Sequence, residues 1–158
     1  MEKKLLLIGG GGHCHSVLDS VLTAKEYNQI GVVVKDQDNY NDLLEDSFVA
    51  NYLIGTDQDL SRIYEEGWRE AFITLGSVGS TKGRRSLFSV IEMIGFVMPI
   101  VVDPSAVVSD RTEIAAGVYI GKHAVVNAGS KIGIGAIINT GAIIEHDCVI
   151  GDFAHVSP

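Results

Sequence analysis

The sequence predicts a parallel α/β layer followed by a parallel β-helix, and two patterns carry that prediction. From Val108 to Val156 an aliphatic residue recurs every six positions, nine times in phase. Before that stretch, apolar strand-like runs alternate with helix-like segments. We therefore expect one domain over residues 1–102 and a second over residues 103–158, with Pro104 interrupting regular structure at the boundary.

A period of six fits neither an α-helix, which repeats every 3.6 residues, nor an alternating strand, which repeats every two. It is the repeat of a parallel β-helix, in which each short strand places one aliphatic side chain inward before the chain turns a corner. Three sides close one coil, so residues eighteen apart should stack. The predicted ladders are Val108-Val126-Ile144, Ile114-Ile132-Ile150 and Ile120-Ile138-Val156.

The first part of the chain reads as strands alternating with helices. We expect strands at residues 3–8, 30–34, 52–54, 71–75 and 96–102. Helices are expected at residues 13–24, 57–67 and 80–94, with Asp57 as the N-cap of the second. Residues 37–45 are polar and are expected to form a loop.

Charge and cysteine content exclude several classes of protein. The formal net charge is −8, which argues against non-specific binding to nucleic acid. The apolar run at the amino terminus stops at Gly9, so we expect neither a membrane span nor a signal peptide. Cys14 and Cys148 lie in different predicted domains without the spacing of metal ligands, which favours a reducing cytoplasm and no metal site.

Four consecutive glycines, from Gly9 to Gly12, separate the first predicted strand from the first helix. Glycine lets a ligand approach the backbone, and a helix amino terminus offers unpaired N–H groups to a phosphate. The dinucleotide fingerprint is incomplete, because its third glycine position holds another residue. Asp36 and Gly76 follow neighbouring strands, at the edge where ligands bind to α/β sheets. A nucleotide or nucleotide sugar fits this edge better than a redox cofactor, although a tight turn without ligand gives the same glycines.

Histidines at the predicted corners of the β-helix are the second candidate for chemistry. His146 lies between Glu145 and Asp147, and His155 stands one place before an inward position, so both are expected to be exposed. A surface histidine alone has no special meaning, but a neighbouring carboxylate fixes its tautomer and raises its basicity. His123 lacks such a neighbour and is expected to be only solvated.

Together these features resemble the nucleotide-sugar acetyltransferases of the PglD and NeuD type, in the left-handed β-helix (hexapeptide repeat) acyltransferase superfamily. Residues 8–13 (IGGGGH) resemble the Gly-x-x-Gly-His loop of that family. Residues 139–157 (NTGAIIEHDCVIGDFAHVS) resemble its catalytic segment. The resemblance implies a Rossmann-like first domain and a left-handed second domain. Because relatives continue for further coils, it also implies a β-helix truncated at its carboxyl end.

The resemblance implies roles for particular residues. His146 matches the general base, Asp147 its acidic neighbour, and His155 a histidine near the acetyl-CoA thioester. The positions that match the nucleotide-sugar site are Gly11, Gly12, His13, Asp36 and Gly76. Cys14 and Lys35 depart from the family pattern, which carries glycine and an acidic residue there.

The implied activity is acetyl-CoA-dependent N-acetylation of a UDP-linked 4-amino sugar, as in glycan biosynthesis, by a cytoplasmic homotrimer with active sites between adjacent β-helices. Neither a metal, nor nucleic acid, nor a membrane is expected as partner. O-acetylation of a sialic acid, a zinc protein of the γ-carbonic anhydrase type and a non-catalytic sugar-nucleotide sensor remain as alternatives. The oxyanion donor and most of the coenzyme A site are expected beyond Pro158, so this shortened chain is expected to have reduced activity or none.

Overall fold

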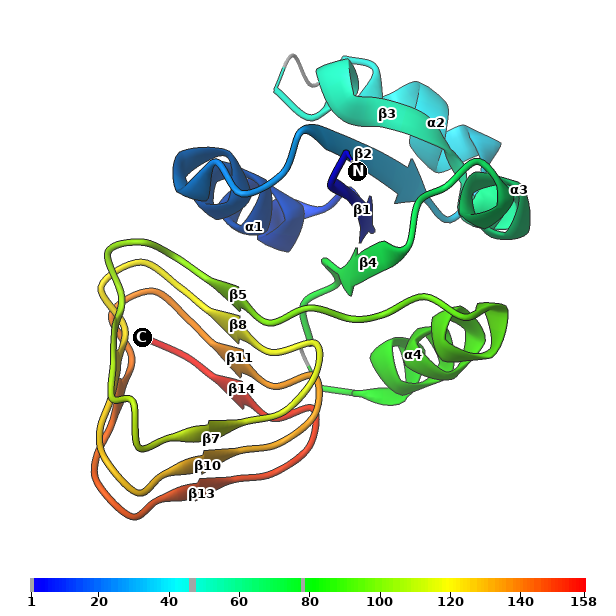
Figure 1. The fold of residues 1–158 in the computed structure, drawn as a ribbon. Coiled ribbons are helices and arrows are strands. Elements are labelled where there is room, and N and C mark those ends of the chain that lie inside the picture. The colour runs from blue at the N-terminus through cyan, green and yellow to red at the C-terminus, as the bar shows by residue number, and fades with distance from the viewer. Residues whose placement is uncertain (1, 46–47, 78) are drawn as a thin grey trace.

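The computed structural model describes residues 2–45, 48–77 and 79–158. In Figure 1 an α/β layer built by the first part of the chain rests on a three-sided β-helix built by the last part. The predicted fold class, a Rossmann-like parallel α/β layer followed by a left-handed parallel β-helix, is confirmed. The division of the chain at residue 102 stays a prediction.

The α/β layer contains a parallel sheet with the strand order β3-β2-β1-β4. Its strands are β1 (Lys4–Ile8), β2 (Gln29–Val34), β3 (Leu53–Thr56) and β4 (Glu70–Ile73). Its helices are α1 (Gly12–Ala24), α2 (Gln37–Leu43), α3 (Leu60–Glu65) and α4 (Lys82–Ile94). Successive side chains of a strand point to opposite faces. Leu5 and Leu7 of β1 accordingly pack with α1, whereas Leu6 and Ile8 pack with α3 and α4.

The β-helix stacks short strands into three parallel sheets, ordered β14-β11-β8-β5, β12-β9-β6 and β13-β10-β7. The strands are β5 (Val101–Val102), β6 (Val107–Val108), β7 (Glu113–Ile114), β8 (Tyr119–Ile120), β9 (Val125–Val126), β10 (Lys131–Ile132), β11 (Ile137–Ile138), β12 (Ile143–Ile144), β13 (Val149–Ile150) and β14 (His155–Val156). All three predicted ladders are confirmed by the strand register, and their side chains form one hydrophobic core.

The corners of the β-helix use a left-handed backbone conformation every six residues. The residues with positive φ are Gly117, His123, Gly129, Gly135, Gly141, Asp147 and Phe153. Glycine adopts this conformation without steric cost, and Asp and His adopt it more readily than most other residues. Phe153 is the exception, and its ring is held by contacts with α4, including a T-shaped contact with Phe88.

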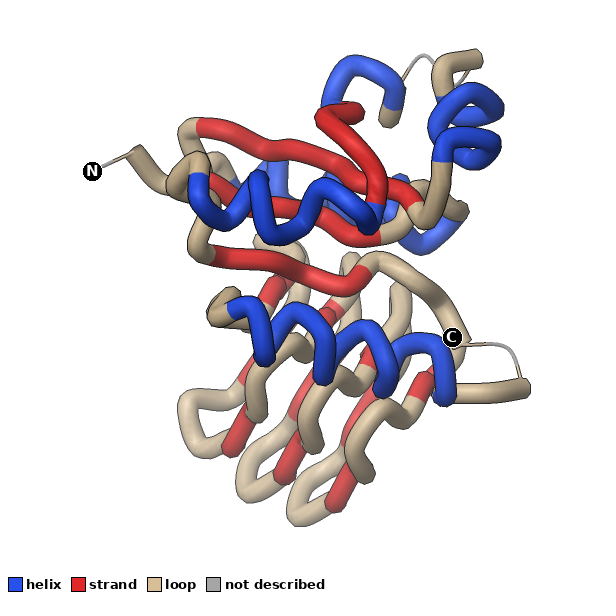
Figure 2. The backbone as a smooth tube through the Cα atoms, turned by 90° about the vertical axis from the view of Figure 1, so that its right-hand side faces the viewer, coloured by secondary structure: helices blue, strands red, loops and turns tan. Residues whose placement is uncertain are grey.

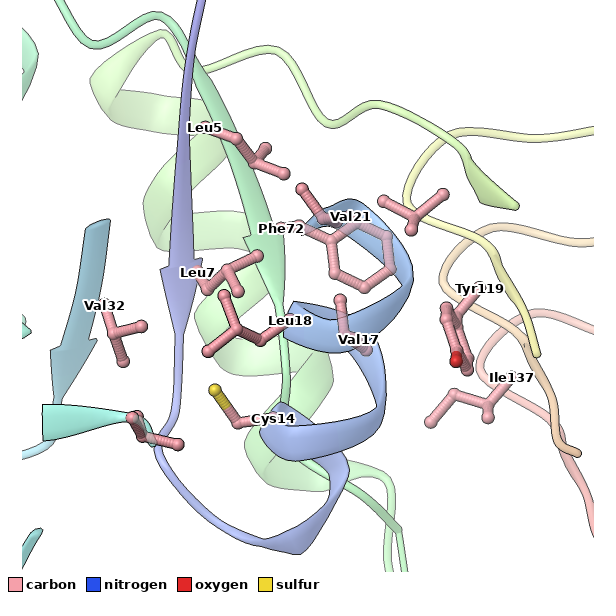
Figure 3. Close-up of a cluster of buried hydrophobic side chains, with 12 residues drawn as sticks. Leu5, Leu7, Cys14, Val17, Leu18, Val21, Val32, Phe72, Tyr119 and Ile137 are labelled. Carbon is pink, nitrogen blue, oxygen red and sulfur yellow. The ribbon is translucent and has the colours of Figure 1, made fainter. Parts of the chain in front are cut away.

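The two parts of the chain share a hydrophobic core. Figure 3 shows Val17 of α1 facing Tyr119 and Ile137, which project outward from β8 and β11. Beneath this contact the buried Asp103 carboxylate accepts hydrogen bonds from Ser20 of α1 at 2.6 Å and from the Lys122 ammonium at 2.8 Å. One outer face of the β-helix is therefore an interior surface of the protein.

This packing corrects the strand expected at residues 96–102. Only Val101–Val102 is a strand there, and it pairs with β8 of the β-helix instead of with the first sheet. Val97 makes a single bridge to Glu70 of β4. The apolar run belongs to both parts because Phe96 and Met98 pack against the first sheet, while Val101 packs against α1.

Two predictions about polar segments were wrong. The loop expected at residues 37–45 contains α2, because the Asp36 carboxylate caps its first turn by accepting from the Asn39 N–H at 3.0 Å. Asp57 does not cap the following helix. Thr56 precedes the 3₁₀ turn Asp57–Asp59 that leads into α3, and the Asp59 carboxylate accepts from the Thr56 N–H at 2.8 Å.

Candidate active site and glycine-loop cavity

His146 lies at the corner of the β-helix between β12 and β13, where the sequence predicted an exposed histidine. Its side chain is 71% exposed, and Asp147 beside it is 78% exposed. The His146 Nδ1 atom lies 2.8 Å from the Asp147 carboxylate. Asp147 can reach the ring because its own backbone is left-handed, with φ of 59°.

The Asp147 carboxylate sets the chemistry of the His146 ring. A carboxylate only accepts hydrogen bonds, so Nδ1 carries the proton and donates it, which leaves the lone pair of Nε2 open to solvent. The hydrogen bond and the negative charge of Asp147 raise the pKa of His146 above its ordinary value. The arrangement therefore makes Nε2 a stronger base than that of an isolated imidazole.

His155 occupies a different environment from the one that the sequence predicted. It projects from β14 toward the α/β layer and is half-buried, not exposed. Its Nδ1 atom lies 3.3 Å from the Ser77 carbonyl oxygen, and its Nε2 atom lies 3.5 Å from the Asn139 amide. His155 is half-buried because the α/β layer covers the outward face of this sheet.

His13, the first histidine of α1, lies beside His155. The two ring centroids are 6.5 Å apart, and Tyr119 packs edge-on against His13 at 5.2 Å. Burial, followed by the nearby positive charges of His155 and Arg84, lowers the pKa of His13 to about 4. His13 is therefore neutral near pH 7. Its buried Nε2 atom has no hydrogen-bond partner within the described ranges.

The glycine loop borders a cavity at the carboxyl ends of β1 and β2. The cavity has a volume of about 720 Å³ and lies between α2 and α4. Gly11 lines it, and a Cβ atom added to Gly11 or Gly12 would meet nothing within 4 Å. The backbone at these two positions is open, and binding of a phosphate there stays a prediction.

The other predicted nucleotide-site residues are placed around this cavity but not in its wall. The side chain of Asp36 is used as the cap of α2. Gly76 follows β4 and lies next to His13, whose Cβ would be 3.9 Å from a Cβ at position 76. Lys35 and Asp57 also line the wall. Sequence reasoning did not identify them, because Lys35 departs from the family pattern and Asp57 was expected to be a helix N-cap.

The structure brings some of the predicted residues together and leaves others apart. His13, Gly76 and His155 meet where the α/β layer contacts the β-helix. His146 and Asp147 lie at the corner between the two sheets that do not face the α/β layer (Figure 1). Among the described residues, no hydrogen bond or ring contact joins this pair to His13 or His155.

Residues 2–45, 48–77 and 79–158 contain no group of three or more His, Cys, Asp or Glu side chains that could hold a metal ion. Within those ranges no helix is both long and apolar enough to cross a membrane.

The chain is similar to known acetyltransferases. A family model described as the PglD N-terminal domain matches residues 4–91. PerB from Caulobacter crescentus, solved in complex with CoA and GDP-perosamine, is 31% identical with a TM-score of 0.81; the match covers 96% of this chain and 67% of PerB. The acetyltransferase domain of PglB from Neisseria gonorrhoeae, in complex with acetyl coenzyme A, is 30% identical with a TM-score of 0.82. This match covers 100% of this chain and 72% of the PglB chain.

The family model spans more than half of the chain, and the two solved structures match nearly all of it. This chain belongs to the PglD-type nucleotide-sugar acetyltransferase family.

Proposed function

We propose that the protein transfers the acetyl group of acetyl-CoA to an amino group on a nucleotide-linked sugar, with His146 as general base. The observation that carries the proposal is the exposed His146 ring, held through Nδ1 by Asp147 at 2.8 Å. The presence of CoA and GDP-perosamine in PerB, and of acetyl coenzyme A in PglB, supports this reaction for a member of the same family.

The chemistry follows from the free lone pair on His146 Nε2. The unprotonated sugar amine attacks the thioester carbonyl carbon, a C–N bond forms, and Nε2 takes the proton that the nitrogen loses. The C–S bond then breaks and CoA leaves as its thiol, with the proton supplied by the imidazolium. Asp147 stabilises the imidazolium between these two steps. A positioned base of this kind contributes about 10²–10⁴-fold to the rate.

We propose a division of labour between the two parts of the chain. Residues 1–102 bind the nucleotide sugar, and residues 103–158 supply the base and part of the coenzyme A site. The residues proposed for the nucleotide sugar are Gly11, Gly12, His13, Asp36 and Gly76. His155 is proposed to lie near the acetyl-CoA thioester. The open backbone at Gly11 and Gly12 and the contact between His13 and His155 support this division.

The position of His146 supports a homotrimer with active sites between neighbouring subunits. The base lies on the corner that faces away from its own glycine-loop cavity, so a second subunit must bring a cavity to it. Val107 and Ile143 project from the neighbouring face and are each 64% exposed, which gives that face an apolar character. Analytical ultracentrifugation should show a trimer, and Ile143→Glu should give folded monomers without activity.

The nucleoside of the substrate is uridine in the sequence-based prediction and guanosine in the ligand of PerB. The proposed function covers both, and a cytoplasmic location and a role in glycan biosynthesis stay predictions.

The test is a substrate panel of UDP- and GDP-linked 4-amino sugars and free sialic acid, read by thiol release and by the mass of the product. An acetylated amino sugar is expected, and His146→Asn should lower kcat/KM by about 10²–10⁴-fold. His123→Asn is the matched control, because His123 is also an exposed corner histidine but has no hydrogen bond to a carboxylate among the described residues. Acetylation of sialic acid alone, or equal activity of the two variants, would contradict the proposal.

A further inference from the structure

The glycine-loop cavity extends beyond the phosphate-binding loop to the end of β3. Its wall runs from Gly11, through Lys35 after β2, to Asp57 after β3. Leu43 of α2 and Leu87 and Val90 of α4 make the wall apolar on two sides. The cavity therefore combines an open backbone, apolar surfaces and a carboxyl group at its far end.

The order of the strands assigns each part of this wall to a part of a nucleotide. In sheets of this kind the phosphates lie at the glycine loop after the first strand, and the ribose lies near the end of the second. The sheet order is β3-β2-β1-β4, so the nucleobase extends past β2 toward β3. Asp57 is the carboxyl group of the wall at that position.

Asp57 has an unmet capacity to accept hydrogen bonds. Its Oδ1 atom is buried and has no hydrogen-bond partner in the parts of the chain that the structure describes. Capping of the following turn, the role expected for Asp57 from sequence, is performed by Thr56 and Asp59. Burial and the nearby Asp36 raise the pKa of Asp57, while Lys35 opposes this effect. A buried acceptor without a donor costs free energy, which a ligand with suitable donors can recover.

The donors of the nucleobases differ in a way that a carboxylate can read. Guanine presents two adjacent donors, the N1–H group and the N2 amino group, which match the two oxygens of a carboxylate. Uracil presents a single N3–H group between two carbonyl oxygens, which would repel the second carboxylate oxygen. Hydrogen bonds to a charged acceptor discriminate more strongly than neutral ones.

We infer that Asp57 reads the nucleobase of the sugar nucleotide and makes guanosine diphosphate, not uridine diphosphate, the preferred carrier. The inference rests on the proposed function, because it names the nucleotide bound in the same cavity. Lys35 lies on the same wall between Asp57 and the glycine loop, where an ammonium group favours the diphosphate. Specificity arises because uracil would place a carbonyl oxygen, not a donor, against one of the two Asp57 oxygens.

Isothermal titration of the full chain with GDP, inosine diphosphate and UDP tests the inference without acetyl transfer. Inosine differs from guanosine only by the missing N2 amino group. GDP should bind about 10- to 100-fold more tightly than inosine diphosphate or UDP. Asp57→Asn should reduce both ratios to below about threefold. Asp42→Asn is the matched control, because Asp42 lines the same cavity but is exposed, and it should keep the preference.

Each outcome decides between the inference and its alternatives. Equal binding of GDP and UDP by the unmodified chain, or a GDP preference that survives Asp57→Asn, overturns the role of Asp57. If the preference is absent but His146-dependent acetylation of a UDP-linked amino sugar is observed, only this inference fails. If no nucleoside diphosphate binds and no nucleotide-linked amino sugar is acetylated, the proposed function fails with it. Asp57→Asn is nearly isosteric, and its circular dichroism spectrum should match that of the unmodified chain.

Discussion

The β-helix and the α/β layer fix their candidate site residues by different physical means. In the β-helix a residue's place follows from its position in a repeat of six, so His146 lies at a corner and Ile138 lies in a ladder. In the α/β layer the fate of a polar side chain depends on its local competitors. Asp36 and Asp57 both follow strands, yet one caps a helix and the other lines a cavity. The repeat therefore predicts where a side chain lies, but it does not predict which groups that side chain contacts.

The largest expected effect is a loss of stability from the centre of a ladder. Ile138 is fully buried and stacks between Ile120 and Val156. Ile138→Ala removes buried methyl groups and leaves a cavity, so the free energy of unfolding should fall by about 2–5 kcal/mol. Ile114→Ala, at the half-buried end of another ladder, should cost less. Urea denaturation measures both losses of stability. Equal losses would mean that a residue at the centre of a ladder contributes no more stability than one at its end.

The next effect tests the contact between the two parts of the chain. Arg84 of α4 is 4% exposed, and its guanidinium donates to the Gly135 carbonyl at 2.6 Å and to the Phe153 carbonyl. Figure 2 shows α4 running alongside the coils that carry these carbonyls. Arg84→Ala leaves these carbonyl oxygens without their donor and should lower the free energy of unfolding by about 1–3 kcal/mol.

Arg85 is the control for this prediction. It is exposed and stacks on the same Phe153 ring, with its Cζ atom 4.6 Å from the ring centroid. Arg85→Ala should cost less than about 1 kcal/mol. A loss as large as that of Arg84→Ala would mean that the buried hydrogen bonds do not join the two parts.

A smaller effect separates the two roles of Asp36. Asp36→Ala removes the cap of α2 and should lower the free energy of unfolding by about 0.5–2 kcal/mol, whereas Asp36→Ser should retain most of it. If the Asp36 carboxylate also binds the sugar nucleotide, both variants should raise KM. An unchanged KM in both would restrict Asp36 to its role as a cap.

The sequence predicted the repeat and its ladders because each coil buries the same kind of side chain at the same position. It also predicted the glycine loop, since glycine has few other reasons to occur four times between a strand and a helix. It did not predict that His155 faces the α/β layer, because a repeat does not tell which of its outer faces is covered. Nor did it find Asp57 in the cavity, because Asp is equally favoured as a helix cap.

The pH dependence of kcat/KM tests the role of His146 most directly. Only neutral His146 can accept a proton, and its pKa is raised by Asp147, so activity should appear with a midpoint above the ordinary value of about 6.5. Asp147→Asn removes the negative charge and should move that midpoint to lower pH; asparagine tolerates the left-handed backbone at this position. If the midpoint of the fall in kcat/KM at low pH is the same in Asp147→Asn as in the unmodified chain, the result contradicts His146 as the base.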